Sequence, residues 1–382
     1  MKRIRGEEPK AKKRYGCLIF FFLAIILLAA LVCFSFFYKD TISKIVFLFT
    51  KPSVNINSSK VIANNFSISG SIYFIKNKNI WVANGNSVRQ LTSSQGIDQI
   101  SVSKDGKIII FSRIDTNYSN IYSLNTQSEI TTQLTRTKLY PNLYNSVWNL
   151  DPILSSQQDK FAFLSDKSKF TQGNSDPSIF EMNLHTLQTT QISHSYSYTG
   201  GDQDPVYYPL DENYILYTKY TYLQGNQQPF SKLYLMDIRN KQSFTLSPDE
   251  AGILSPSFSH DGKYILFLKR DTTDIALNKN NSIYIMPFQL ENILQSIPDA
   301  AFLKDFSFKE FIKSGINAMP VFSPDDKNIA YFTESNNDFN LATENISISM
   351  NDIGKLNIKT SNEQFITQNS SLTTISRMSW IQ

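Results

Sequence analysis

Cysteine is almost absent from this 382-residue sequence, which contains only Cys17 and Cys33. Both lie in one uncharged stretch, residues 17–37, so the rest of the chain has no cysteine at all. That part can form no disulfide and has no thiolate for nucleophilic or redox chemistry. We expect its stability to come from apolar burial and hydrogen bonding alone.

Histidine is also scarce, and the three residues, His185, His194 and His260, occupy different positions of the repeat described below. A symmetric three-histidine metal site is therefore not expected. The sequence also lacks HExxH, GxSxG and CxxC motifs and a phosphate-binding glycine loop, so the usual hydrolase, redox and nucleotide sites are not indicated. These absences favour a protein that is not an enzyme and needs no metal or other cofactor.

Basic charge is concentrated at the N-terminus. Residues 1–16 contain seven of the 37 Lys and Arg residues and two of the 33 Asp and Glu residues. The remainder, with 30 basic and 31 acidic residues, is close to neutral. We therefore expect no nucleic-acid partner, because such partners require a basic surface on the folded body of the protein.

A long apolar segment follows the basic residues. It reads CLIFFFLAIILLAALVCFSFF over 17–37, and a helix of this length spans roughly 30 Å, the thickness of the hydrocarbon core. We predict a transmembrane helix over 17–38. Because positive charge stays on the cytoplasmic side, the basic tail 1–16 is expected in the cytoplasm and the rest of the chain outside it.

Two alternatives for the apolar segment involve cleavage. A secretory signal peptide has an apolar region of about 7–15 residues and small residues at the cleavage site, whereas this run ends in Phe36, Phe37 and Tyr38. A lipoprotein signal cut before Cys33 would need a small residue in place of Val32. The pattern favours an uncleaved, single-pass anchor in the cell membrane.

The sequence beyond residue 70 repeats itself. Residues 39–69 show no helical periodicity and are predicted to be a stalk or linker. Five later segments each contain a short apolar stretch, a turn and a second apolar stretch: 101–111, 152–164, 205–218, 256–268 and 320–332. The Asp-Gly pairs at 105–106 and 261–262 are typical hairpin turns. The second stretches share one aromatic position, occupied by Phe111, Phe163, Tyr217, Phe267 and Tyr331.

Further strands are expected after each hairpin. Third strands are predicted at 121–124, 179–182, 233–236, 283–286 and 346–350, and shorter fourth strands at 131–135, 189–193, 243–247 and 364–367. Four antiparallel strands in about 50 residues are typical of a propeller blade.

One further unit is split between the two ends of the repeat region. Residues 70–94 resemble strands two, three and four of a blade, with Phe74 at the aromatic position. Residues 373–382 resemble the missing first strand, with Trp380 where other units have Phe258 and Phe322. We therefore predict an all-β, six-bladed β-propeller over 70–382, closed by the C-terminal strand.

The repeat resembles that of the TolB-like propeller family, whose WD-like repeat has the form PxFSPDGKxIxFxS followed by IYxM and LT. The segments PSFSHDGKYILFL at 256–268 and PVFSPDDKNIAYF at 320–332 carry this resemblance. It implies a six-bladed propeller, and relatives of this fold include periplasmic scaffolds, peptidase gating domains and polysaccharide lyases. The chain differs from TolB itself because it has no room for a separate N-terminal α/β domain.

Three acidic residues stand just before first strands: Asp98, Asp151 and Asp204. First strands line the central channel of a propeller, so these carboxylates could form a ring at one mouth and bind a cation. Alternatively, each carboxylate caps the turn that enters its own strand.

The links between strands two and three, and between blades, are long and rich in aromatic residues. All of them are expected on one face, because successive strands alternate in direction. These links include 114–119, 136–149, 166–176, 194–203, 218–231, 269–281 and 334–344. The largest insertion, 287–317, follows a third strand, which leaves its face open, and it has the spacing of one or two short helices. Exposed aromatic side chains suit protein or sugar ligands, although they can instead seal gaps between blades. The candidate binding residues are Tyr140, Tyr144, Trp148, Tyr196, Tyr198, Tyr220 and Tyr222.

The sequence therefore predicts a membrane-anchored extracytoplasmic propeller that acts as a non-catalytic protein- or glycan-binding scaffold of the cell envelope. The alternative is a cell-envelope polysaccharide lyase or hydrolase with an acidic site at the channel mouth. Loss of activity with a chelator would favour this alternative.

Overall fold

The computed structural model describes residues 59–93, 96–137, 146–169, 176–195, 200–222, 229–247, 252–270, 281–295, 309–310, 316–335, 338–350, 356–367 and 375–382. All of them belong to one unit of the chain, Ser53–Gln382. The predicted transmembrane helix, 17–38, lies outside these residues. Among the described residues, no helix has the length and apolar character needed to cross a membrane.

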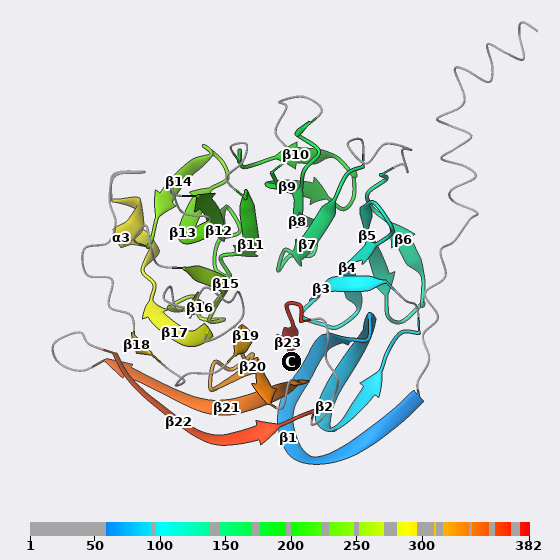
Figure 1. Cartoon of the computed structure of the whole chain (residues 1–382), viewed down its shortest axis with the longest axis vertical. Coiled ribbons are helices and arrows are strands. Elements are labelled where there is room, and N and C mark those ends of the chain that lie inside the picture. Colours follow the sequence, from blue (N-terminus) through cyan, green and yellow to red (C-terminus); the bar gives the residue numbers. More distant parts are fainter. Residues whose placement is uncertain are drawn as a thin grey trace, which may run out of the picture. The chain divides into compact units, whose positions relative to one another are not determined.

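Six antiparallel sheets are arranged around a central axis as the blades of a propeller (Figure 1). This confirms the predicted all-β, six-bladed architecture. Blades one to three contain, in chain order, β1 (Ser59–Lys76), β2 (Asn79–Gln90) and β23 (Ser379–Ile381); β3 (Ile97–Val102), β4 (Ile108–Ile114), β5 (Ser119–Asn125) and β6 (Thr131–Gln133); and β7 (Asn149–Leu154), β8 (Lys160–Ser165), β9 (Ser178–Asn183) and β10 (Thr189–Gln191).

The remaining three blades have four strands each. They contain β11 (Asp202–Tyr207), β12 (Tyr214–Tyr222), β13 (Pro229–Asp237) and β14 (Gln242–Thr245); β15 (Ile253–Phe258), β16 (Tyr264–Arg270), β17 (Asn281–Pro287) and β18 (Lys309–Glu310); and β19 (Asn317–Phe322), β20 (Asn328–Ser335), β21 (Asp338–Met350) and β22 (Leu356–Phe365).

The turns between first and second strands follow one chemical pattern in blades two, five and six. In blade two, the Ser103 hydroxyl donates to Asp105 Oδ1 at 2.7 Å and accepts from the Ile108 backbone N–H at 2.9 Å. Gly106 supplies the left-handed conformation that completes the turn, with φ 69°. The same serine–aspartate pair recurs as Ser259 with Asp261 and as Ser323 with Asp325. The repeated sequence therefore specifies the hairpin through its own side chains.

The core lies between blades. Six clusters of buried apolar side chains occur, and each joins two neighbouring blades, so that all six interfaces of the ring are filled. The shared aromatic position supports this arrangement: Phe111 stacks on Tyr122 with ring centroids 5.5 Å apart, and Tyr217 stacks on Tyr234 at 5.4 Å. A single blade exposes both faces, so stacking in a ring is what removes this apolar surface from water.

Blade one is completed by the end of the chain. Strand β23 pairs with β1, with Trp380 opposite Ile72. The Trp380 side chain is 5% exposed and packs in the cluster between blades one and six. Its indole Nε1–H donates to the Ser69 carbonyl at 2.9 Å. The first strand of this blade therefore comes from a segment some 300 residues away in sequence.

Three elements differ from the prediction. Blade one has three strands, because β2 runs to Gln90 and pairs with the early part of β1, which begins at Ser59 rather than at Gly70. In blade six, β21 begins at Asp338, within the predicted loop 334–344. The predicted third strand, 346–350, instead extends β21 and pairs with β22 beyond its pairing with β20.

The insertion at 287–317 contains one short described helix, α3 (Leu290–Leu294). Within the same insertion, Lys309–Glu310 form β18 and pair with β17 rather than a second helix. The link that holds α3 joins the third and fourth strands, so it lies on the face of the short turns and not on the opposite face with the other long links. Phe288, just before α3, packs against Tyr208 and Phe258 near those turns.

Candidate functional site

The first strands around the channel share a backbone irregularity near their beginnings. Asp151, Asp204, Ser255 and Met319 each have positive φ, between 45° and 51°, and each precedes a proline. The strand pairing shifts at the same point in each blade. These bulges turn the side chains of Asp151 and Asp204 out of the regular alternation of the strand.

Arg377 connects the beginning of the C-terminal segment to the opposite side of the ring. It precedes β23 in blade one, and its guanidinium Nη1 donates to the Pro205 carbonyl in blade four at 2.7 Å. Its Nη2 lies 3.3 Å from Asp151 Oδ2 in blade three and 4.0 Å from Asp204 Oδ1. The Arg377 side chain is only 11% exposed. Arg377 therefore spans the channel from blade one to blade four. The sequence alone did not indicate this contact.

The predicted acidic residues are brought close together, but Arg377 lies among two of them. Burial raises the pKa of Asp151 to about 6, Arg377 opposes this rise, and the charges of Asp204 and Asp98 add to it. Burial also raises the pKa of Asp98, against the effect of Lys78. No group of three or more His, Cys, Asp or Glu residues suited to a metal ion occurs among the described residues.

Asp204 connects its blade to the next one. Its Oδ2 accepts a hydrogen bond from the Ser255 backbone N–H of the next blade at 2.9 Å. The Asp151 backbone N–H in turn donates to the Gln99 side chain of the preceding blade at 2.6 Å. The acidic end of the channel is therefore a network that joins adjacent blades and is neutralised in part by Arg377.

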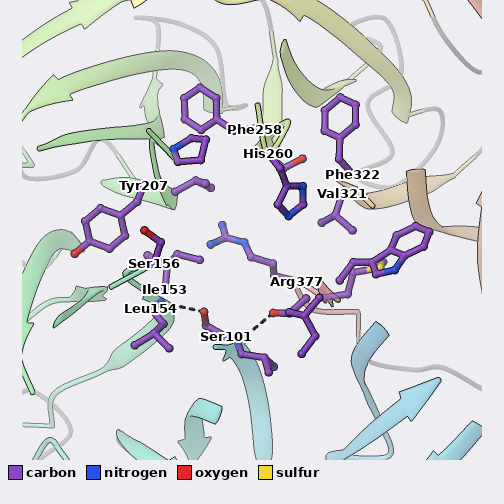
Figure 2. A pocket seen from close by; sticks show the side chains of 18 of the residues that line it. Ser101, Ile153, Leu154, Ser156, Tyr207, Phe258, His260, Val321, Phe322 and Arg377 are labelled. Atoms are coloured by element: carbon purple, nitrogen blue, oxygen red, sulfur yellow. Dashed lines mark hydrogen bonds between the residues drawn. The ribbon is translucent and has the colours of Figure 1, made fainter. Parts of the chain in front are cut away.

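A cavity of about 220 Å³ occupies the centre of the ring on the other side of this network. Arg377 lies across the middle of the view, among side chains from the surrounding inner strands (Figure 2). The cavity extends from Arg377 to the short turns between first and second strands, where Lys104, Ser156 and His260 line it. It therefore reaches the face opposite to that of most long links.

The predicted aromatic binding residues are only partly described. Tyr140, Tyr144, Tyr196 and Tyr198 lie outside the described residues, and Tyr222 belongs to β12. Trp148 is half-buried just before β7, and its backbone N–H donates to Asp166 Oδ1 at 2.8 Å. Tyr220 is half-buried on β12. Tyr220 is thus fixed by its strand, and Trp148 by its backbone hydrogen bond to a buried carboxylate. A binding surface on a rigid scaffold requires side chains that are positioned in this way.

The histidines occupy separate places. His260 lies in the turn of blade five, where Asp326 of blade six accepts from its backbone N–H at 2.8 Å and lies 3.1 Å from its Nδ1. His185 follows β9 and His194 follows β10, both in blade three. The three side chains therefore do not form one site.

Asp202 is a buried carboxylate that the sequence analysis passed over. It is fully buried, accepts from the Ser193 hydroxyl, and lies 3.8 Å from Lys219 Nζ. Burial raises its pKa to about 6, despite Lys219 and Ser193. Asparagine stands at the same strand position in two other blades, where Asn149 and Asn317 donate to backbone carbonyls. A comparison of the repeats could have revealed this exception.

Asp202→Asn is expected to raise the free energy of unfolding at pH 7 by about 1 kcal/mol, because the amide needs no buried charge and can donate as in the other blades. The pKa of Asp202 is higher in the folded protein than in the unfolded chain. The contribution of Asp202 to the free energy of unfolding is therefore present at low pH and declines as pH rises through about 4 to 6. Urea unfolding at pH 4 and pH 7 should show a smaller decline in the variant.

Asp105→Asn is the matched control, because hydrogen bonds lower the pKa of exposed Asp105, first among them that from Ser103. The contribution of Asp105 to the free energy of unfolding is lost as pH falls. Asp105→Asn should therefore lower the free energy of unfolding at pH 7, opposite to the effect of Asp202→Asn. An Asp202→Asn protein that is less stable than the parent at pH 7 would contradict the interpretation of Asp202 as a costly buried charge.

No protein-family model matches this chain, and no curated protein matches it. Solved structures do. TolB from Acinetobacter baumannii is 17% identical, with 82% of this chain and 67% of that chain covered and a TM-score of 0.53. A putative TolB from Agrobacterium tumefaciens is 14% identical, with coverage of 82% and 94% and a TM-score of 0.48.

An oligogalacturonate lyase from Vibrio parahaemolyticus is also similar, at 13% identity, with coverage of 83% and 90% and a TM-score of 0.45. Identities this low establish the fold only. The six blades and the similarity to TolB from A. baumannii together show that this chain has the fold of the TolB-like six-bladed propellers.

Proposed function

We propose that the protein is a membrane-anchored, extracytoplasmic β-propeller that binds a protein or glycan of the cell envelope and does not catalyse a reaction. The observation that carries this proposal is the position of Arg377. It occupies the acidic end of the channel and pairs with Asp151, the most buried of the three acidic residues predicted there. A carboxylate that is held in an ion pair and shielded from solvent is poorly placed to bind a cation or to exchange a proton with a substrate.

One observation favours the alternative, an envelope polysaccharide lyase or hydrolase. The pKa of Asp151 is raised to about 6, and carboxyl groups with raised pKa values serve as general acids in some glycosidases. Activity on envelope polysaccharides that is lost in Asp151→Asn, with the fold intact, would support the enzyme and contradict the scaffold.

Membrane anchoring is supported by the sequence of residues 1–38. An uncharged apolar run preceded by seven basic residues favours a helix that spans the bilayer with its N-terminus in the cytoplasm. Protease added to intact spheroplasts should therefore digest residues 70–382 and leave a membrane-bound fragment that contains the tail. A propeller that is digested only after the membrane is permeabilised would contradict this topology.

The binding surface is proposed to be the face of the long links. Trp148 and Tyr220 support it, because both lie on that face at the ends of strands and are half-buried rather than packed in the core. The neighbouring Tyr140 and Tyr144 are included on the basis of sequence alone. A cluster of aromatic side chains provides apolar area with a polar group, as protein and sugar binding sites often do.

Replacing Tyr140, Tyr144 and Trp148 with alanine should weaken binding to detergent-solubilised envelope proteins or to purified envelope polysaccharides by about tenfold or more. The melting temperature should change little. Leu210→Ala is the control, since this side chain is 65% exposed in a turn on the opposite face. Unchanged binding in the triple variant, or collapse of its fold, would contradict the proposal.

A further inference from the structure

The central cavity is bordered at one end by Arg377 and reaches the short turns at the other. Arg377 crosses the channel between blades one and four, and its partners Asp151 and Asp204 lie behind it. The walls beyond it are largely apolar and include Val206, together with Ile153 and Val321, which are labelled in Figure 2. The short turns border the other end of the cavity, so a ligand could enter it from the short-turn face.

The wall of the pocket offers few backbone donors to an extended peptide. Proline occupies one position in four of the inner strands: Pro152, Pro205, Pro256 and Pro320. The Leu154 N–H donates to the Ser101 hydroxyl at 2.9 Å, and the Val102 N–H donates to the Ser379 hydroxyl at 3.3 Å. The inner strands are thus satisfied by one another, and strand addition is disfavoured.

Charge in and around the pocket is largely compensated. Arg377 faces Asp151 and Asp204. At the rim, Glu212 accepts hydrogen bonds from Ser156, and His260 is paired with Asp326. Lys104, also at the rim, is exposed to water, and no ion pair among the described residues directs it into the apolar interior. An ionic ligand would bring an unpaired charge into this apolar space, which is costly. The pocket therefore suits an uncharged ligand.

Arg377 still has donors to offer. A guanidinium has five N–H groups, and two of them donate to the Pro205 carbonyl and the Asp151 carboxylate. Among the described residues, no hydrogen bond is found for its other N–H groups, although Asp204 Oδ1 lies 4.0 Å from Nη2. Because Arg377 lines the pocket, these donors can meet an oxygen acceptor on a bound molecule.

We infer that the central pocket binds a small uncharged molecule that has an apolar, ring-sized body and an oxygen acceptor directed at Arg377. This inference is independent of the binding surface proposed for the opposite face. It assigns the two faces to different ligands, a macromolecule at the long links and a small molecule at the short turns. Arg377 would determine specificity by its hydrogen bond, and the wall residues would provide the apolar contact.

Ligand-observed NMR titration of the folded propeller in the full-length protein can test this with four probes of similar size. Acetophenone has a carbonyl acceptor, ethylbenzene lacks one, benzoate is anionic and benzylamine is cationic. Acetophenone should bind about tenfold more tightly than ethylbenzene, as expected for one hydrogen bond to a charged donor. Both ions should bind more weakly than acetophenone.

Two variants distinguish the pocket from other sites. Val321→Phe fills the pocket and should weaken acetophenone binding at least about tenfold, whereas Arg377→Lys keeps the charge and should reduce acetophenone to the level of ethylbenzene. Ile130→Ala, at an exposed position outside the pocket, should change nothing. The inference is overturned if no probe binds, if either ion binds as well as acetophenone, or if a normally melting Val321→Phe protein binds acetophenone as the parent does.

Discussion

Replacing Trp380 with alanine is expected to lower the free energy of unfolding by about 3–5 kcal/mol, the usual cost of truncating a buried tryptophan. The residue is 5% exposed, packs between blades one and six, and donates a hydrogen bond to Ser69. An ordinary domain is stable by roughly 5–15 kcal/mol. The variant should therefore melt at a much lower temperature and be cut rapidly by protease under conditions that leave the parent intact.

Trp81 provides a matched control in the same blade. Its indole Nε1–H also donates to a backbone carbonyl, that of Lys76 at 3.1 Å, but the residue is only half-buried and does not belong to the closing strand. Trp81→Ala should cost clearly less than Trp380→Ala. Equal losses in urea unfolding would show that closure by β23 has no special weight in the stability of the ring.

Replacing Arg377 with methionine is expected to cost about 3–5 kcal/mol at pH 7, because Asp151 and Asp204 would remain near each other without their cation. The pKa of Asp151 is already above its usual value, mainly because of burial, and loss of Arg377 should raise it further. Protonation would then relieve the penalty, so the difference between variant and parent should shrink as pH falls from 7 to about 5.

The double variant Arg377→Met with Asp151→Asn separates this electrostatic effect from lost packing. It should recover a large part of the stability at pH 7, with a coupling energy of at least about 1 kcal/mol in a double-mutant cycle. Asp151→Asn alone should be neutral or slightly stabilising at pH 7, since a raised folded pKa means that the charged form disfavours folding. No recovery in the double variant would show that Arg377 acts by filling space.

The repeat made most of the blades predictable, because hairpin turns and aromatic positions are local features. The Ser-x-Asp-Gly turns of blades two and five use hydrogen bonds between residues that are close in sequence. Blade six was the exception. Ala342 stands opposite Tyr331, where other blades have a second aromatic ring, so the aromatic signal of the third strand was missing. The Tyr331 hydroxyl instead donates to Glu363 at 2.8 Å.

The candidate site was predictable only in part, because it depends on contacts across the ring. The acidic residues were visible at the beginning of first strands, but Arg377 is separated from Asp151 by 226 residues. Nothing local in sequence connects them, and only the closed ring places the C-terminal segment opposite blades three and four. The pocket likewise depends on which inner-strand side chains meet at the centre, which the alternation of strands does not specify.

The split first blade also determines how the molecule reaches its folded state. Trp380 and its hydrogen-bond partner Ser69 are 311 residues apart, so this contact is among the most non-local in the chain, and such contacts form late in folding. The entropic cost of closing a longer loop grows slowly, by about 0.6 kcal/mol for each doubling of loop length. The distant pairing should therefore slow folding more than it lowers the free energy of unfolding. Until β23 arrives, β1 presents an open edge on which the closing strand of another copy can pair. We therefore expect a higher protein concentration during refolding to favour strand-exchanged oligomers over closed monomers.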